Sequence, residues 1–257
     1  DSYGQGLRQS VLGANTAITP TTSLTYKEGT GADEAAAVQT LNNALSILTK
    51  QAAPQALVAV TNNFSDKVLA GLVGYGISTN PQMQIVMSDG AKTTRVLDLL
   101  SVGSPAEQAA MKTHLARVYG TAPGVDKNNA NGIYNGFLAA FGARWPGVDP
   151  RTSAFSAYAY DAAYAVGLAV CAAGEVTPGR VSEFLLHFNA AGSADKVPVG
   201  QSSFLNGCNK LAAAAGLSMQ GATGVVSFTP HGDRELGLYE RWSIDVANKV
   251  FISNPAM

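Results

Sequence analysis

The sequence predicts an α/β protein whose core is a parallel sheet with helices packed against it. Two short apolar runs with β-branched residues, "ALVAVT" at 56–61 and "MQIVMSDG" at 83–90, suit strands buried on both faces, the second running into a loop. Stretches with helical spacing lie before and between them. Such a short alternation of strands and helices is typical of βαβ units. The 257 residues, 46% hydrophobic and 14% charged, are enough for one or two substantial cores.

The first part of the chain supplies most of this pattern. Within 33–50, apolar residues recur at spacings of three and four from Val38 to Leu48, which predicts a helix with one apolar stripe. The run at 67–76 is also predicted to be helical and to end at its glycines. The chain opens with "DSYGQGLRQSVLGAN" at 1–15, which we interpret as the loop that leaves a buried strand, followed by a helix, although the sequence shows no strand before it.

The second half begins with a stretch rich in glycine, proline and asparagine, residues 119–132, which we interpret as a connection between domains or subdomains. Residues 153–174 are apolar almost all round the helical circumference, so we expect a deeply packed helix with Ser153 as its N-cap. The remaining predicted elements are helices at 177–192 and 201–216, each closed by a glycine, and a strand–turn–strand at 221–251 with its turn at Pro230–Asp233.

Charge and motifs argue against several classes of function. The net charge is −1, the isoelectric point is about 6.3 and no stripe of Lys and Arg occurs, so we expect no nucleic-acid partner. No apolar stretch in the sequence is long enough to span a bilayer. Gly4-Gln5-Gly6 lacks the third glycine of a dinucleotide fingerprint, and neither a nucleophile elbow nor a P-loop occurs. The three histidines lie in different segments, so we predict no catalytic residue, no metal site and no cofactor.

Polar and aromatic residues follow the predicted strands directly, at the edge of a parallel sheet that usually faces a ligand. They are Asn62, Asn63 and Phe64 after the first run, Ser88 and Asp89 after the second, and Tyr3 in the opening loop. Aromatic faces, amides and one carboxylate suit a small polar molecule, including one with an ammonium group. Each residue alone could instead serve the fold, as a turn former, a helix cap or a packed ring. Their occurrence together favours a ligand site.

The two cysteines leave two interpretations open. Cys171 and Cys208 both lie in apolar, helix-like runs without CxxC spacing or a histidine cluster nearby, so they do not form a metal site. Two buried free thiols are one interpretation. A single structural disulfide is the other, and it requires an oxidising compartment.

Four stretches, in order along essentially the whole chain, carry a family resemblance: "DSYGQGL", "SDG" after a strand, "FSAYAYDAAYAVGLAV" and "GATGVVSFTPHGDRELGLYERWSI". The most specific are the third, an apolar helix with Tyr-Asp-Ala, and the fourth, whose glycines lead to an aromatic final strand. The chain thereby resembles the type I periplasmic solute-binding proteins, in particular the leucine/isoleucine/valine-binding branch that serves ABC importers. Thr229 and His231 stand where family members more often have Asp and Asn or Lys, which alters one turn.

The resemblance implies a type I periplasmic-binding-protein fold, with two Rossmann-like lobes whose parallel sheets are flanked by helices. It places residues 1–118 in lobe 2, residues 119–221 in the returning part of lobe 1 with a hinge near 119–125, and residues 222–257 in the hinge return and the terminal strands of lobe 2. It also implies that the first part of lobe 1, about 100–150 residues, is lacking from this chain, which leaves that lobe incomplete. We expect the lacking part to exist beyond this chain or to be replaced by another copy.

The resemblance further implies a non-enzymatic, extracytoplasmic component of an ABC importer. It would capture an amino acid-like ligand by hinge closure and present it to a membrane permease. Matched position by position, Tyr3 is the aromatic lid, Asn63 or Phe64 a second contact, and Asp89 the acidic partner of the ligand ammonium. A periplasmic or extracellular location follows, compatible with a lipid anchor at a missing N-terminus. In an exported protein the Cys171–Cys208 disulfide is favoured over free thiols.

Two other functions stay open at this point. The first is a ligand-sensing domain of the same fold in a receptor or regulator. An upstream lipoprotein signal would favour the importer, and a downstream membrane helix would favour the sensor. The second is an α/β enzyme such as a hydrolase, against which the lack of a nucleophile motif argues.

Overall fold

A computed structural model describes residues 2–14, 23–29, 31–48, 56–75, 83–125, 132–188, 196–213, 216–235 and 237–255 of the chain. The chain divides into two compact units. Unit 1 comprises residues 1–122 and 241–254, and unit 2 comprises residues 123–240 and 255–257. The assignment of these units to the two lobes of a binding protein, with the predicted boundaries at 118/119 and 221/222, stays a prediction.

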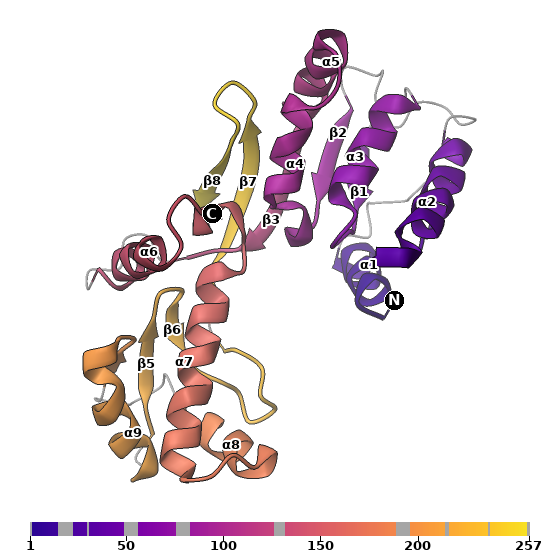
Figure 1. The fold of residues 1–257 in the computed structure, drawn as a ribbon. Helices are drawn as coiled ribbons and strands as arrows, with labels where there is room; N and C mark the ends of the chain where they lie inside the picture. Colours follow the sequence, from indigo (N-terminus) through magenta and orange to yellow (C-terminus); the bar gives the residue numbers. More distant parts are fainter. Residues whose placement is uncertain are drawn as a thin grey trace. The chain divides into compact units, whose positions relative to one another are not determined.

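Unit 1 is an α/β unit (Figure 1), and its strands β3, β7 and β8 each extend by one or two residues across its boundary with unit 2. Its helices are α1 (Ser2–Ala14), α2 (Glu34–Leu48), α3 (Ser65–Gly74), α4 (Thr94–Asp98) and α5 (Pro105–Leu115), with short 3-10 turns η1 (Gly31–Asp33), η3 (Asp89–Ala91) and η4 (Leu99–Ser101). Its strands are β1 (Ala56–Ala59), β2 (Gln84–Met87), β3 (Val118–Pro123), β7 (Tyr239–Asp245) and β8 (Val250–Pro255). The helix predicted at 33–50 and both predicted strands are confirmed.

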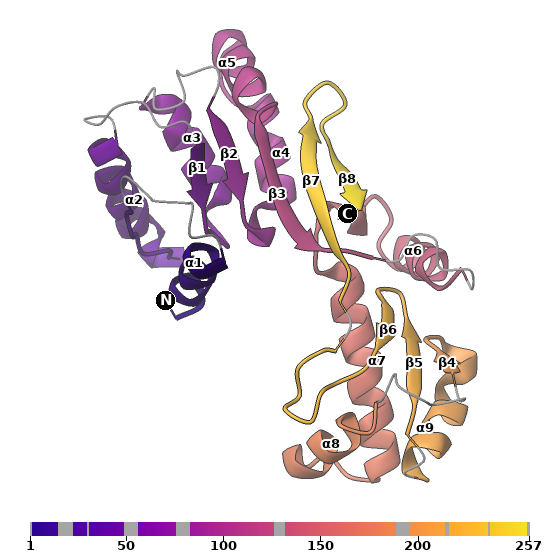
Figure 2. The same ribbon diagram turned by 180° about the vertical axis from the view of Figure 1, so that it is seen from behind.

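The strands of unit 1 form one five-stranded sheet in the order β1-β2-β3-β7-β8. β1, β2 and β3 are parallel, with Val58 opposite Val86 and Val86 opposite Tyr119. Figures 1 and 2 show α3 and α4 against the same face of β1 and β2, and β7 and β8 running in opposite directions as a hairpin. The predicted parallel sheet of βαβ units is therefore present.

The expected burial of the strands on both faces is wrong for β1. Ile85 and Val118, which are register partners in β2 and β3, share one face of the sheet and are 0% and 1% exposed. Val58 lies on the other face and is 52% exposed. Gly120 lets the Trp242 ring pack closely against β3, since a Cβ there would lie 2.5 Å from a ring carbon. The described residues of unit 1 thus bury one face of the sheet more deeply than the other.

Unit 2 packs helices against a small three-stranded sheet. Its helices are α6 (Ile133–Arg144), α7 (Ser156–Ala173), α8 (Pro178–Leu185) and α9 (Phe204–Ala212), with short 3-10 turns η5 (Pro150–Thr152) and η6 (Gln201–Ser203), and its strands are β4 (Lys196–Pro198), β5 (Ser218–Gly221) and β6 (Gly224–Val226). β4 pairs with β5 in parallel, and β5 pairs with β6 antiparallel. α7 packs against both α8 and α9. The centre of this core consists of fully buried Leu168, Phe188, Leu211, Leu217 and Met219.

The helix predicted at 153–174 corresponds to α7, but two expectations about it are wrong. Its N-cap position is Phe155, and Ser153 instead accepts a hydrogen bond from the Phe155 N–H just upstream, at 3.2 Å. Its buried residues form one stripe rather than a full circumference: Ala157, Asp161, Ala165, Leu168 and Ala169. Val166 on another side is 45% exposed. Alanine makes the sequence look apolar all round, although alanine also suits exposed helical positions.

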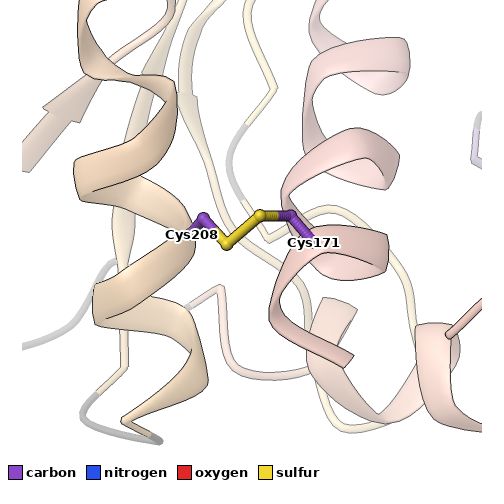
Figure 3. The surroundings of a disulfide bond; sticks show 2 residues. All are labelled: Cys171 and Cys208. Carbon is purple, nitrogen blue, oxygen red and sulfur yellow. A yellow bond between two sulfur atoms is a disulfide. The ribbon is translucent and has the colours of Figure 1, made fainter. Parts of the chain in front are cut away.

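A disulfide joins Cys171 in α7 to Cys208 in α9, with a Cα–Cα distance of 5.7 Å (Figure 3). The predicted pairing is confirmed, and the interpretation of two free thiols is wrong. Both cysteines pack in the core of unit 2, where Cys208 is buried. The bond closes a segment with a sequence separation of 37 residues and links the two helices that flank this core.

Two loop predictions need correction. The stretch at 119–132 begins as strand β3, because Gly120 serves close packing and Pro123 stands at the strand end, where proline is tolerated. The turn at Pro230–Asp233 closes only a single antiparallel bridge between Phe228 and Arg234. β6 on one side of it and β7 on the other belong to different sheets. The hairpin of the C-terminal region is formed by β7 and β8.

Candidate functional site

The candidate ligand site lies in unit 1 at the carboxyl ends of β1 and β2. There the loops at 60–64 and 88–91 are joined by Ser88. Its N–H donates to the Ala59 carbonyl at 3.1 Å, and its hydroxyl donates to the Thr61 carbonyl at 2.7 Å and accepts from the Thr61 N–H at 3.1 Å. The hydroxyl of Ser88 therefore connects the two loops, and this predicted ligand residue has a structural role in the site.

The glycine of the "SDG" stretch allows the two loops to approach closely. A Cβ on Gly90 would lie 2.5 Å from the Thr61 carbonyl oxygen and 2.6 Å from the Asn62 Cα. The Ser65 hydroxyl at the start of α3 donates to the Gly90 carbonyl at 3.2 Å. The Asp89 carboxylate accepts the Gly90 N–H at 2.9 Å, which orients this half-buried carboxylate at the turn η3.

Glu28, which the sequence analysis missed, contributes a carboxylate to the first of these loops. Its Oε1 accepts hydrogen bonds from the Thr61 hydroxyl at 2.8 Å and the Asn62 N–H at 2.9 Å, and its Oε2 accepts the Asn63 N–H at 2.9 Å. The Tyr26 hydroxyl adds a fourth hydrogen bond at 3.3 Å. Burial raises the pKa of the Glu28 carboxyl, but these hydrogen bonds outweigh burial and hold that pKa below its ordinary value.

A signal for Glu28 was present in the sequence. Residues 23–29, "SLTYKEG", lie in the structure without regular secondary structure, yet half-buried Leu24, Tyr26 and Glu28 alternate with three exposed residues at 23, 25 and 27. This two-residue period is typical of an extended segment with one face against the protein. The alternation of Leu24, Tyr26 and Glu28 before Gly29 therefore indicates a short extended segment that turns Glu28 toward the protein.

The structure brings together five of the six predicted site residues. Asn62 and Asn63 are exposed, and their side-chain amides make no hydrogen bond to another described residue. Phe64 is only 2% exposed and packs in the core of unit 1, so its ring is not an open face for a ligand. Tyr3 lies in the first turn of α1 rather than in the predicted loop, and its side chain lies outside the described part of the chain.

Chemically, the site offers two exposed amides and one half-buried carboxylate on a rigid base. The Arg95 guanidinium donates to the Asn63 carbonyl at 3.1 Å and ties α4 to the same loop. Amides donate and accept hydrogen bonds, and a carboxylate pairs with an ammonium group. Within the described ranges, no group of three or more His, Cys, Asp and Glu residues is arranged to hold a metal ion.

Comparisons with known proteins show the fold of the chain. A leucine-binding protein, LivK, of Thermotoga maritima is similar with a TM-score of 0.51 and 14% identity, over 91% of this chain and 50% of that one. LivJ of Streptococcus pneumoniae, a branched-chain amino acid transporter substrate-binding protein in complex with isoleucine, has a TM-score of 0.49 and 18% identity, over 82% of this chain and 48% of that one. A type 1 periplasmic binding protein of Bordetella pertussis has a TM-score of 0.48 and 18% identity, over 90% of this chain and 51% of that one.

The chain thus has the α/β fold of the type I periplasmic binding proteins, as the resemblance implied. It spans about half the length of the solved structures that it matches. No family model matches the sequence, and the comparison with curated proteins gave no match. Among the described residues, no helix is both long and apolar enough to cross a membrane.

Proposed function

We propose that the chain belongs to an extracytoplasmic solute-binding protein of an ABC importer, which captures an amino acid or a related small amide or carboxylate. The observation that carries the proposal is the fold shared with a leucine-binding protein over 91% of this chain. The polar residues at the carboxyl ends of β1 and β2 support it, because ligands of open parallel sheets bind at that edge. The role is binding and delivery rather than catalysis.

In this proposal the ligand ammonium pairs with Asp89, and the amides of Asn62 and Asn63 complete its polar contacts. A buried ammonium without a carboxylate partner would cost several kcal/mol. The exposure of the two amides and the partial exposure of Asp89 support these roles. Tyr3 remains the proposed aromatic lid, whereas Ser88 and Phe64 support the site from within the protein.

Units 1 and 2 serve as the two lobes, and the ligand shifts the protein from an open to a closed form. Such a shift requires contacts that exist only in the closed form, because a ligand with equal affinity for both forms moves no equilibrium. The connections at 122/123 and 240/241 are the proposed hinge. The closed form is then recognised by a membrane permease.

The disulfide supports a location outside the cytoplasm. Structural disulfides persist in oxidising compartments such as the periplasm and the extracellular space. The bond between Cys171 and Cys208 is therefore consistent with a periplasmic or extracellular protein that works beside its permease.

The test is a binding screen on the full-length protein, purified by unfolding and refolding to remove any ligand carried through purification. The common amino acids and their amides are screened by thermal shift, and hits are titrated by calorimetry. At least one amino acid should bind in the micromolar range, and Asp89→Asn should weaken it at least tenfold, the order expected for a lost charge-assisted contact. Asp98→Asn, on the exposed side of α4, is the matched control. Absence of binding to every amino acid and amide in the screen would refute the proposal.

A further inference from the structure

We propose that Glu28 is a positioning residue of the candidate site, whose carboxylate holds the loop Thr61–Asn63 in the conformation that binds ligand. This inference rests on the proposed function, since it concerns the same site. Glu28 itself touches no ligand in this role. It acts through the backbone N–H groups of Asn62 and Asn63, whose side chains are exposed at the end of β1.

The geometry shows that one carboxylate fixes three consecutive residues. Oε1 is shared by the Thr61 hydroxyl and the Asn62 N–H, and Oε2 accepts the Asn63 N–H, all at 2.8–2.9 Å. Hydrogen bonds to an ionised acceptor are about twice as strong as neutral ones. Because two successive N–H groups point at the same carboxylate, the backbone between them has little freedom to rotate.

Among the described residues, the backbone N–H groups of Asn62 and Asn63 donate to no acceptor other than Glu28. Phe64 occupies the N-cap position of α3, makes no side-chain cap and has no polar side chain to do so. Arg95 instead donates to the Asn63 carbonyl, and Ser88 bonds the N–H and the carbonyl of Thr61. The backbone N–H groups of Asn62 and Asn63 have Glu28 as their acceptor, whereas Arg95 and Ser88 bond other backbone atoms of the loop.

Glu28 is itself held in place by its neighbours. The hydroxyl of Tyr26 donates to its Oε1. The carbonyl of Lys27 lies 3.4 Å from the Thr40 hydroxyl of α2, which donates its proton to the Ala37 carbonyl at 2.7 Å. Gly29 lies so close to η1 and α2 that a Cβ there would be 2.7 Å from the Asp33 carbonyl oxygen of η1 and 3.0 Å from the Ala37 Cβ of α2. The segment that carries Glu28 therefore packs against η1 and α2, which are outside the loop that it positions.

The first experiment measures hydrogen exchange of the backbone N–H groups of Asn62 and Asn63 in the full-length, ligand-free protein. Glu28→Gln keeps the size of the side chain but turns its NH₂ toward one of the loop donors. Exchange at these two amides should rise about tenfold, as expected when a charge-assisted hydrogen bond is lost. Glu34→Gln is the control, because the Glu34 carboxylate at the start of α2 forms an exposed ion pair with Lys67 at 3.5 Å and accepts no hydrogen bond from a described residue of this loop. Unchanged exchange in Glu28→Gln would overturn the inference.

The second experiment separates positioning from general stability. Thr61→Val removes the hydroxyl that donates to Glu28, whereas Thr61→Ser retains it. With L-leucine as the probe in calorimetry, Glu28→Gln and Thr61→Val should raise Kd several-fold with little change in Tm, and Thr61→Ser should restore the affinity. A Tm that falls without a change in Kd would overturn the positioning role.

The two proposals fail in different ways. If the wild-type protein binds neither L-leucine nor any other amino acid, the proposed function fails, and with it the role of Glu28 in binding. The amide exchange still decides whether Glu28 holds the loop. If the wild-type protein binds and the Glu28→Gln variant binds equally well, the proposed function stands and the inference about Glu28 is refuted.

Discussion

The hydroxyl of Tyr158 in α7 donates a hydrogen bond to the carbonyl oxygen of Gly124, over 2.7 Å. The same hydroxyl lies 3.4 Å from the carbonyl of Leu238, and that carbonyl also accepts the Gly124 N–H at 2.7 Å. One side chain thus joins the segment that enters unit 2 after β3 to the segment that leaves it before β7. Both contacts lie within three residues of the points where the chain passes between the units.

Loss of this hydroxyl should loosen both segments. In Tyr158→Phe we expect the free energy of unfolding to fall by about 1 kcal/mol, the net value of one hydrogen bond. Amide exchange at Gly124 should also increase, because its acceptor Leu238 is no longer restrained. Tyr160→Phe is the matched control on the same helix, since no described residue forms a hydrogen bond with the Tyr160 hydroxyl. Equal effects of both substitutions would contradict the assignment.

Asp161 should be one of the most sensitive residues of unit 2. It is 2% exposed, and its carboxylate accepts the Ala222 N–H at 2.8 Å, the Thr223 N–H at 2.9 Å and the Thr223 hydroxyl at 2.5 Å. Asp161→Asn places an NH₂ group against buried donors and should cost about 2–4 kcal/mol of stability. Urea unfolding measures this, with exposed Asp233→Asn as the control. A loss no larger than the control's would show that the carboxylate charge is dispensable.

The disulfide between Cys171 and Cys208 should stabilise unit 2 by about 2–4 kcal/mol, because it restricts the unfolded chain. The double variant Cys171→Ala/Cys208→Ala should therefore unfold at lower temperature than the wild-type protein. Addition of a reductant should lower the Tm of the wild-type protein toward that of the variant and leave the variant unchanged. If reductant lowers both equally, the effect does not arise from this bond.

His114 should make the protein less stable in acid. It is buried in α5, and neither ring nitrogen has a hydrogen-bond partner among the described residues. Burial, with a smaller contribution from the Arg117 charge, lowers its pKa from 6.5 to about 4. The unfolded state takes up a proton near pH 6.5 and the folded state only near pH 4, so stability is full above this window and falls through it as pH decreases.

The expected loss from His114 is up to about 3 kcal/mol at the acid end of the window, since each pKa unit corresponds to about 1.4 kcal/mol. His114→Leu should remove this part of the pH dependence while leaving stability at neutral pH similar. Urea unfolding of both proteins across the window measures it. Parallel pH profiles would show that another group is responsible.

Local patterns predicted a large part of unit 1. The periodic apolar residues of α2 and the apolar runs of β1 and β2 lie where they were expected, because burial of one stripe or of a short run is encoded in neighbouring residues. Predictions that depended on distant contacts were less successful. Gly120 in β3 was interpreted as part of a loop, but it allows close packing of the Trp242 ring, which lies 122 positions away in the sequence (242 − 120).

For the site, the sequence by itself determined that Asn62, Asn63, Ser88 and Asp89 stand at the ends of parallel strands. That follows from the strand pattern and from the common direction of the strands. The tertiary structure alone decided which of them are exposed, which connect the loops, and that Glu28 binds the loop from 34 and 35 residues away. The physical reason is that a hydrogen bond between distant segments depends on where packing brings their backbones, and no local pattern carries that information.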